Sequence, residues 1–408
     1  MTDRLIVWLG HDIAGALVRP TDSDRFWYEA ADDGPAITMA DAGRGQIWAP
    51  LFTRRWFEGL LPEGPQRLAA EQHHRVDPGD TFALLEAIGW ECAGAISVMP
   101  EGRLPDTGRY MPMTETEAIA RLDAAPGIIG DLDLSVRLSL GGVQDKLLWR
   151  RLDDAWALPL DGAPSTHILK PEPARWPGLA MAEAWSLVAA AAATTTAEAE
   201  VYAPMGHRPT VVVTRYDRVE SDGTIARRHQ EDLCQLLGLS SNAKYALPGP
   251  KPRPDDPTLA RLAGLLVRRA ADPPVELVRL HEQTTVNMAL GNADAHAKNH
   301  SVLHEDGTAA LSPLYDISPT MAFLPEQHTA ALRIDGKARM DGITRGHLVR
   351  EAVGWGIPPA LAQRTVEETL ERLRAGMDVA DSRYPDLPAD VRSQVARHFD
   401  RLATSTLV

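Results

Sequence analysis

Residues 292–299 read N-A-D-A-H-A-K-N, and they follow a segment, Val275–Leu290, whose apolar residues recur at helical spacing. Polar and ionisable side chains are dense in this stretch, although alanine and leucine dominate the chain around it. A solvated turn at the end of a helix is one interpretation of this composition. The density of groups that can bind a metal or accept a proton favours a functional loop.

Asp294 and Asn299 are five residues apart, as are the base and the metal-binding amide in the catalytic loop of protein kinases. Further along, residues 311–316 read L-S-P-L-Y-D, which predicts a short strand that ends in an acid, Asp316. Protein kinases deliver their second metal-binding aspartate in this way. The region therefore predicts phosphoryl transfer, with Lys298 near the transferred phosphoryl group.

A zinc site is an alternative interpretation of the same region. His296, His300 and His304 are spaced by four residues, which would align three imidazoles on an uninterrupted helix. Gly307 and the strand-like run Ser301–Leu303 argue against such a helix. We expect His296 to be a packed or hydrogen-bonded residue of the loop.

Lysine is rare in this chain, at six residues against 36 arginines. One of the six, Lys170, follows the extended run Thr166–Leu169, and a strand lysine pairs with nucleotide phosphates in kinases. Glu183 comes thirteen residues later on an alanine-rich helix expected over 180–193, and we predict that it pairs with Lys170. A surface lysine on an edge strand and a solvated acid are the alternatives for these two residues taken alone.

A third segment, residues 139–146, reads S-L-G-G-V-Q-D-K and lies between two strand-like runs. Its adjacent glycines, Gly141 and Gly142, would let backbone N–H groups approach phosphate oxygens closely. A hairpin turn is the alternative for the pair by itself, and no Walker A sequence occurs in the chain. The order along the chain is nevertheless that of a kinase: glycine loop, strand lysine, helix acid, catalytic loop and final aspartate.

Length and composition describe a folded protein of two or three domains. The 408 residues carry a net charge of −14, which disfavours non-specific binding of nucleic acid or anionic membrane by the chain as a whole. Two cysteines are too few for a disulfide framework, and neither a targeting segment nor an apolar run of transmembrane length is evident. We therefore expect a cytoplasmic protein.

Nine of the ten tryptophans lie before residue 186, which predicts a strand-rich first half and a helical second half. Within the first half we expect a helical region over 51–72 that breaks at Pro62, and a helix over 81–88 that Asp80 caps. After residue 230 the pattern is helical, apart from the strand-like runs near 301–303 and 311–316.

Six segments together resemble the HipA family, bacterial serine/threonine kinase toxins of type II toxin–antitoxin modules. Four of them have been described above: the glycine loop at 139–146, the strand with Lys170 at 167–171, the loop D-A-H-A-K-N at 294–299 and L-Y-D at 314–316. The other two are T-R-Y-D-R at 214–218 and Q-E-D-L-C-Q at 230–235 with Gly238. The run F-E-G-L-L-P-E-G at 57–64 is also typical of the family. The resemblance covers the chain from about Phe52 to Asp316.

The resemblance implies an α+β, two-lobed, protein-kinase-like fold. Residues 1–108 would form an extra N-terminal subdomain, residues 109–217 an α/β domain like a kinase N-lobe, and residues 218–408 an all-helical C-lobe with the catalytic loop. ATP and Mg²⁺ would bind between the lobes.

The resemblance also implies a role for each site residue. Asp294 would be the catalytic base towards a serine or threonine hydroxyl, and Asn299 and Asp316 would hold Mg²⁺. Lys170 and the loop residues Gly141, Gly142, Val143 and Gln144 would bind the nucleotide phosphates, Thr214 and Tyr216 would form the adenine-contacting hinge, and Ser139 would be an inactivating autophosphorylation site.

The implied partner is a HipB-like helix-turn-helix antitoxin, through which the complex would contact DNA. The implied target is a translation-related protein, such as an aminoacyl-tRNA synthetase. Two alternatives stay open: a catalytically silent, kinase-like scaffold that acts as corepressor with the antitoxin, and a kinase of small molecules.

Overall fold

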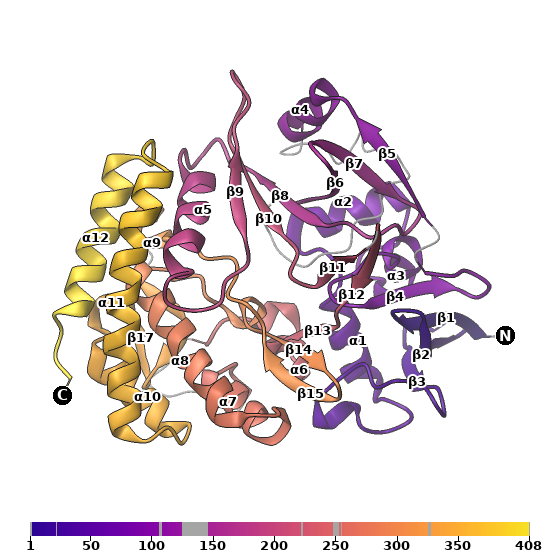
Figure 1. Cartoon of the computed structure of the whole chain (residues 1–408). Helices are drawn as coiled ribbons and strands as arrows, with labels where there is room; N and C mark the ends of the chain where they lie inside the picture. Colours follow the sequence, from indigo (N-terminus) through magenta and orange to yellow (C-terminus); the bar gives the residue numbers. More distant parts are fainter. Residues whose placement is uncertain are drawn as a thin grey trace. The chain divides into compact units, whose positions relative to one another are not determined.

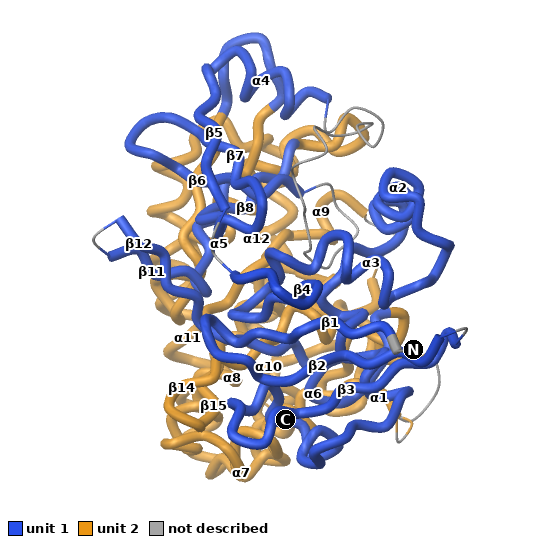
Figure 2. Tube along the Cα trace, turned by 90° about the vertical axis from the view of Figure 1, so that its right-hand side faces the viewer, with its two compact units in different colours: residues 1–171, 203–208, 212–241 blue, residues 172–202, 209–211, 242–408 orange. Residues whose placement is uncertain are grey.

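Two compact units make up the computed structural model, which is of the α+β class (Figures 1 and 2). Unit 1 comprises residues 1–171, 203–208 and 212–241, and unit 2 comprises residues 172–202, 209–211 and 242–408. No helix among the described residues is long and apolar enough to cross a lipid bilayer. The structure describes residues 2–21, 23–105, 108–124, 146–221, 223–247, 253, 255–324 and 328–407.

An antiparallel sheet with the strand order β3-β2-β1-β4 begins unit 1. Leu5 pairs with Leu17 across its central strands, and Leu5 and Val7, which share a face because side chains alternate along a strand, are both buried. The strands are β1 (Thr2–Leu9), β2 (Asp12–Pro20), β3 (Trp27–Ala30) and β4 (Ile96–Pro100), and the helices are η1 (Asp41–Gly43), α1 (Pro50–Glu58), α2 (Gly64–His74) and α3 (Thr81–Ile88).

Local sequence signals determine where the helices beside this sheet begin and end. The helical region expected over 51–72 is confirmed as two helices, since α1 ends at Glu58 and α2 begins at Gly64, with Pro62 between them. Proline interrupts a helix because it lacks a backbone N–H and clashes with the preceding turn. The cap is confirmed as well, because the Asp80 carboxylate accepts a hydrogen bond from the Ala83 N–H at 3.0 Å.

Aromatic rings fill the core beside this sheet, as the tryptophan-rich first half predicts. Tyr28, Trp48, Trp56 and Phe57 contact one another with ring centroids 4.5 to 6.2 Å apart. The side chains of Trp56 and Phe57 are fully buried. Large, rigid rings of this kind give a small subdomain much of its buried apolar area.

In a second sheet, five strands follow one another in the order β5-β7-β6-β8-β10. Strand β8 lies between β6 and β10 and pairs Leu169 with Leu147 of β6, so it is not the edge strand that one alternative supposed. The strands are β5 (Arg109–Met113), β6 (Leu147–Leu152), β7 (Ala155–Leu160), β8 (His167–Pro171) and β10 (Thr210–Thr214). The remaining elements are α4 (Glu115–Ala124), β11 (Arg218–Ser221), β12 (Thr224–Arg227), β13 (Gln230–Asp232) and α6 (Leu233–Leu237).

Unit 2 is mainly helical, and its longest helix, α11, packs against α5, α8 and α10. Its helices are α5 (Leu179–Ala190), η2 (Ser241–Ala243), α7 (Leu259–Arg269), α8 (Pro273–Leu290), η3 (Ala297–Asn299), α9 (Thr320–Phe323), η4 (Met340–Gly342), α10 (Arg345–Gly354), α11 (Pro359–Arg383) and α12 (Ala389–Ala403). Its strands are β9 (Ala199–Tyr202), β14 (Ser301–Glu305), β15 (Thr308–Leu311), β16 (Thr329–Ile334) and β17 (Lys337–Arg339).

The expectation of an all-helical C-lobe is wrong, because two antiparallel hairpins, β14–β15 and β16–β17, lie within it. Both hairpins turn at an Asp-Gly pair. Asp306 and Gly307 have φ values of 49° and 79°, and Asp335 and Gly336 have 49° and 74°. Two successive positive φ angles are what a two-residue turn of type I′ requires, and Asp-Gly adopts them readily.

We expect His281 to make the stability of unit 2 depend on pH. Burial lowers the pKa of this histidine to about 4, although the Ala362 carbonyl accepts a hydrogen bond from its ring at 3.1 Å. The unfolded chain binds the proton more tightly, so stability is complete above the unfolded pKa near 6.5 and is lost as the pH falls towards 4. Between pH 7 and pH 5 the free energy of unfolding should fall by about 2 kcal/mol from this residue.

Urea unfolding of the wild type and of a His281→Gln variant at both pH values measures this contribution. Glutamine keeps a donor for the Ala362 carbonyl but does not titrate, so the variant should lose less stability on acidification. An equal loss in both proteins would contradict the prediction.

Candidate active site

The stretch at 292–299 follows helix α8 directly. Gly291 ends the helix with a φ of 73°, and its N–H donates to the Asn287 carbonyl. This left-handed conformation costs a residue with a Cβ atom more than it costs glycine. At the other end, the Asp272 side chain accepts a hydrogen bond from the Val275 N–H at 3.3 Å. The loop is therefore built on a helix with defined ends.

Asn292 joins three parts of this region. Its amide nitrogen Nδ2 donates to Oδ1 of Asn287 at 2.8 Å and to the Asp316 carbonyl at 3.4 Å, while its Oδ1 accepts from the Asp294 N–H at 3.2 Å. The residue is buried. It thus links the end of α8, the backbone of Asp294 and the segment that carries Asp316. We did not predict this role, since an asparagine beside an acid is common in polar turns.

Asp294 and Asn299 lie next to each other because the chain between them turns back. The Asp294 carbonyl accepts hydrogen bonds from the His296 N–H at 2.7 Å and from Asn299 Nδ2 at 3.1 Å. The 3-10 turn η3 completes the reversal. His296 is packed, as expected, with its ring edge-on to Tyr245 at 5.3 Å between centroids.

Asp316 has a φ of 55°, in the left-handed region that non-glycine residues seldom adopt. Such a conformation persists only where the surroundings hold it, and it is frequent at functional sites. The preceding residues are well fixed: Tyr315 donates to the Lys298 carbonyl at 2.7 Å, and the Leu314 N–H donates to the Thr195 carbonyl at 2.9 Å. The structure therefore brings the segment of Asp316 to the loop that carries Asp294 and Asn299.

The environment of Asp294 disfavours its charged form. Burial raises the pKa of its carboxyl group, and the negative charge of Asp316 raises it further. A hydrogen bond from Tyr245 and the positive charge of Lys244 act in the opposite direction without cancelling these effects. A carboxylate with a raised pKa is a better proton acceptor than an exposed aspartate.

The zinc alternative is wrong. His300 follows the 3-10 turn and His304 lies in β14, so the three histidines are not on one helix. Within the part of the chain that the structure describes, no group of three or more His, Cys, Asp or Glu side chains could hold a metal ion. Burial lowers the pKa of His300 to about 4, as is typical of a core histidine.

The other predicted site residues lie in both units. In unit 1, Lys170 is buried on the central strand β8, Thr214 ends β10, and the hydroxyl of Tyr216 donates to Oε1 of Gln230. In unit 2, Glu183 is buried on α5 and Lys298 in η3. Neither Glu183 nor Lys170 is the exposed residue that the alternatives supposed, and their pairing stays a prediction. The glycine-loop residues Ser139, Gly141, Gly142, Val143 and Gln144 lie outside the described residues.

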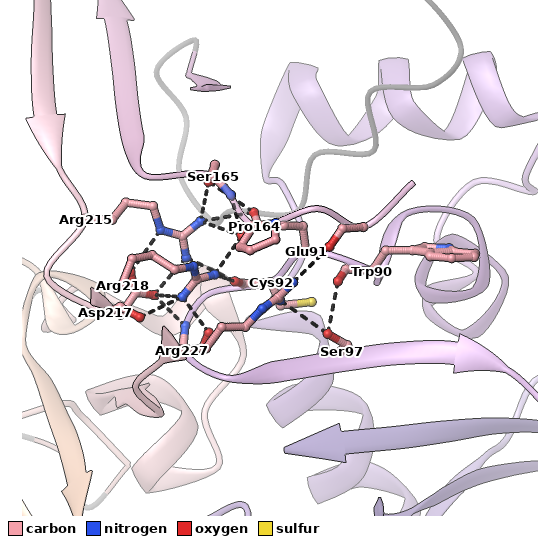
Figure 3. Close-up of polar contacts among 12 residues, drawn as sticks. Trp90, Glu91, Cys92, Ser97, Pro164, Ser165, Arg215, Asp217, Arg218 and Arg227 are labelled. Atoms are coloured by element: carbon pink, nitrogen blue, oxygen red, sulfur yellow. Dashed lines mark hydrogen bonds and ion pairs between the residues drawn. The ribbon is translucent and has the colours of Figure 1, made fainter. Parts of the chain in front are cut away.

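Sequence reasoning missed a buried ionic cluster around the segment of Thr214 and Tyr216 (Figure 3). Arg215 donates to Glu91 at 3.0 Å and to Asp217 at 2.8 Å, and Arg218 contacts the same two acids at 2.7 and 3.0 Å. All four side chains are almost completely buried. The motif at 214–218 therefore directs three charged residues into the protein.

The cluster keeps its acids ionised. Burial alone would raise the pKa of Glu91 and of Asp217, but the charges of Arg215 and Arg218 outweigh it and lower both. The Gly94 N–H also donates to Asp217 at 2.7 Å. Two arginines and two acids thus fix the backbone on either side of Tyr216.

The Q-E-D motif at 230–232 has a structural role as well. Glu231 is fully buried and accepts hydrogen bonds from the Met39 N–H at 2.8 Å and from Trp56 Nε1 at 2.7 Å. Asp232 and Gln235 form a reciprocal capping box at the start of α6. The motif connects the aromatic core of the N-terminal sheet to the segment that begins α6.

Comparison with known proteins supports the resemblance. Residues 138–380 match the family model of the HipA-like C-terminal domain, and residues 5–99 match that of the HipA N-terminal domain. The chain is 36% identical over 409 residues to the "Putative kinase Y4mE" of Sinorhizobium fredii, with 95% of each chain covered. It is 27% identical to the serine/threonine-protein kinase toxin HipA of Shewanella oneidensis, with 84% of this chain and 80% of that protein covered.

A solved structure agrees with these matches. A chain from the Shewanella oneidensis MR-1 complex of HipA, HipB and operator DNA superposes with a TM-score of 0.81 at 26% identity, covering 98% of this chain and 96% of that chain. The match extends over both units, and it supports the predicted kinase-like fold class. The chain therefore belongs to the HipA family of serine/threonine-protein kinase toxins.

Proposed function

We propose that this protein is an ATP-dependent serine/threonine protein kinase and acts as a toxin. The observation that carries the proposal is the proximity of Asp294, Asn299 and Asp316 beyond the C-terminal end of α8, in the chain order of the corresponding kinase residues. In the reaction, the acceptor hydroxyl oxygen bonds to the γ-phosphorus as the bond to ADP breaks, and the hydroxyl proton passes to Asp294.

The side chains of Asn299 and Asp316 are suited to the divalent metal ion that accompanies ATP. Asn299 and Asp316 offer an amide and a carboxylate oxygen, the donors that Mg²⁺ prefers. A site with few protein ligands is typical of Mg²⁺ in kinases, because phosphate oxygens and water complete its coordination. When bound, Mg²⁺ neutralises charge on the transferred phosphoryl group.

The nucleotide would be bound by the residues that the sequence singles out for it. Lys170, paired with Glu183, and Lys298 would supply positive charge at the phosphates, the backbone of Gly141, Gly142, Val143 and Gln144 would cover them, and Thr214 and Tyr216 would contact the adenine. The buried cluster of Arg215 and Asp217 supports the last assignment, because it fixes the backbone around Tyr216. Phosphorylation of Ser139 would add negative charge beside these phosphates and repel them.

A HipB-like antitoxin is the partner that we propose, by analogy with the Shewanella oneidensis complex, with DNA contacted through it. The target would be a translation-related protein such as an aminoacyl-tRNA synthetase. A silent corepressor scaffold is the second candidate, but Lys170, Asp294, Asn299 and Asp316 are all present, and a scaffold would need none of them.

Transfer of the γ-phosphate tests the proposal. We expect the purified chain, incubated with γ-labelled ATP and Mg²⁺, to label serine or threonine in casein or in itself, as phosphoamino-acid analysis would show. Label that appears only in small molecules would favour the small-molecule alternative. No transfer to any acceptor, with antitoxin binding intact, would favour the silent scaffold.

A further inference from the structure

The side chain of Tyr245 contacts the carboxylate of Asp294 directly. Its hydroxyl donates a hydrogen bond to Oδ1 of Asp294 at 2.8 Å. The ring packs edge-on against His296, which lies two residues beyond the acid. Tyr245 is 40% exposed, so tight packing in a closed core does not force its hydroxyl against Asp294. It links a residue from a loop with no catalytic motif to the proposed base.

The backbone around Tyr245 is held on two sides within unit 2. The Lys244 carbonyl accepts a hydrogen bond from the Ala297 N–H at 3.0 Å, which fastens the segment to the loop that carries Asp294. The Ala246 N–H donates to the Ala331 carbonyl of β16 at 2.9 Å. One residue on each side of Tyr245 is thus fixed, and the contacts with His296 and Asp294 place its ring and hydroxyl.

The same strand also holds the loop. The Ala331 N–H donates to the Ala293 carbonyl at 2.9 Å, next to Asp294. Ala331 of strand β16 therefore bonds to both segments: its carbonyl accepts from the segment of Tyr245, and its N–H donates to the segment of Asp294. The backbones of the two segments are therefore connected through Ala331, in addition to the side-chain hydrogen bond between Tyr245 and Asp294.

We propose that Tyr245 is a positioning residue that orients the Asp294 carboxylate for the acceptor hydroxyl. A carboxylate on a short side chain rotates about its Cβ–Cγ bond unless a partner holds it. By donating to Oδ1, Tyr245 fixes that rotation and leaves the second oxygen, Oδ2, to accept the proton of the substrate hydroxyl. This inference rests on the proposed function, since it assigns a partner to the base of that reaction.

The test compares Tyr245→Phe with the wild type. Phenylalanine keeps the ring against His296 and removes only the hydroxyl. With γ-labelled ATP, Mg²⁺ and casein, we expect kcat to fall about tenfold while the KM for ATP stays within about twofold, because a misoriented base lowers the rate of the chemical step and not nucleotide affinity. Tyr110→Phe is the matched control. It removes a hydroxyl that donates to the Pro164 carbonyl at 2.9 Å in unit 1, and it should leave kcat unchanged.

The outcomes separate this inference from the proposed function. An active wild type with an equally active Tyr245→Phe variant would overturn the inference alone. A variant faster than the wild type would also overturn it, because the tyrosine would then obstruct the base. An inactive wild type would overturn the proposed function and the inference with it. Parallel changes in kcat and in the KM for ATP would assign the hydroxyl a general structural role instead.

Discussion

Replacing Asp294 by asparagine is expected to reduce phosphate transfer at least about 100-fold, because the amide cannot accept the proton of the acceptor hydroxyl. The fold should survive. Asparagine has the same shape and retains an oxygen for the Tyr245 hydroxyl, and Asn299 bonds to the backbone carbonyl of Asp294, which the substitution leaves in place.

Labelling of casein from γ-labelled ATP measures this loss. Asp306→Asn is a suitable control, since Asp306 lies in the turn between β14 and β15 with a φ of 49°, a conformation that asparagine also tolerates. The control should keep its activity. Unaltered transfer by the Asp294 variant would show that another group accepts the proton or that none is needed.

The largest effect on stability is expected from Glu91→Ala. The substitution leaves Arg215 and Arg218 buried with Asp217 as their remaining acid in the cluster. Breaking a buried ion pair by removing one partner costs about 3–5 kcal/mol, because an uncompensated charge stays in a medium of low dielectric. Nucleotide affinity should fall too, since the backbone beside Tyr216 would lose its fixed position.

Urea unfolding measures this cost, with Glu101→Gln as a control at an exposed position, where a change of less than about 0.5 kcal/mol is expected. Stability from the cluster should also decline in acid. The pKa of Glu91 is lowered in the fold, so its contribution is complete above the unfolded value near 4.5 and is lost as the pH falls further. A loss below about 1 kcal/mol in Glu91→Ala would contradict a strongly coupled cluster.

The elements that the sequence predicts well have strong local signals. Pro62 separates two helices, and Asp80 caps a third. The loop over 292–299 is also local: its eight residues contain Asp294 and Asn299, and the short reversal between them needs no distant partner. Asp316 was singled out because an acid after such a loop follows a known order of elements, but the short strand expected over 311–316 is wrong: β15 ends at Leu311, and Leu314 makes only an isolated bridge with Thr196.

The features that were missed depend on residues far apart in the chain. The ion pair of Glu91 with Arg215 joins positions separated by 124 residues, and no local pattern marks either side chain as buried. Tyr245 contacts Asp294 across 49 residues, from a proline-rich region that predicts only a loop. The two hairpins of unit 2 are different, because the Asp-Gly pairs at 306–307 and 335–336 are turn signals that could have been recognised.

The bonds of Glu231 have a consequence for anyone who shortens this chain. A fragment that starts near residue 100 would retain Glu231 but lose Met39 and Trp56, which supply donors to its carboxylate. It would also retain Arg215 and Arg218 without Glu91. The family model of the N-terminal domain ends at residue 99, close to this border, yet residues before it supply a counterion and hydrogen-bond donors to buried groups of the later part of unit 1, so expression trials should keep the N-terminus.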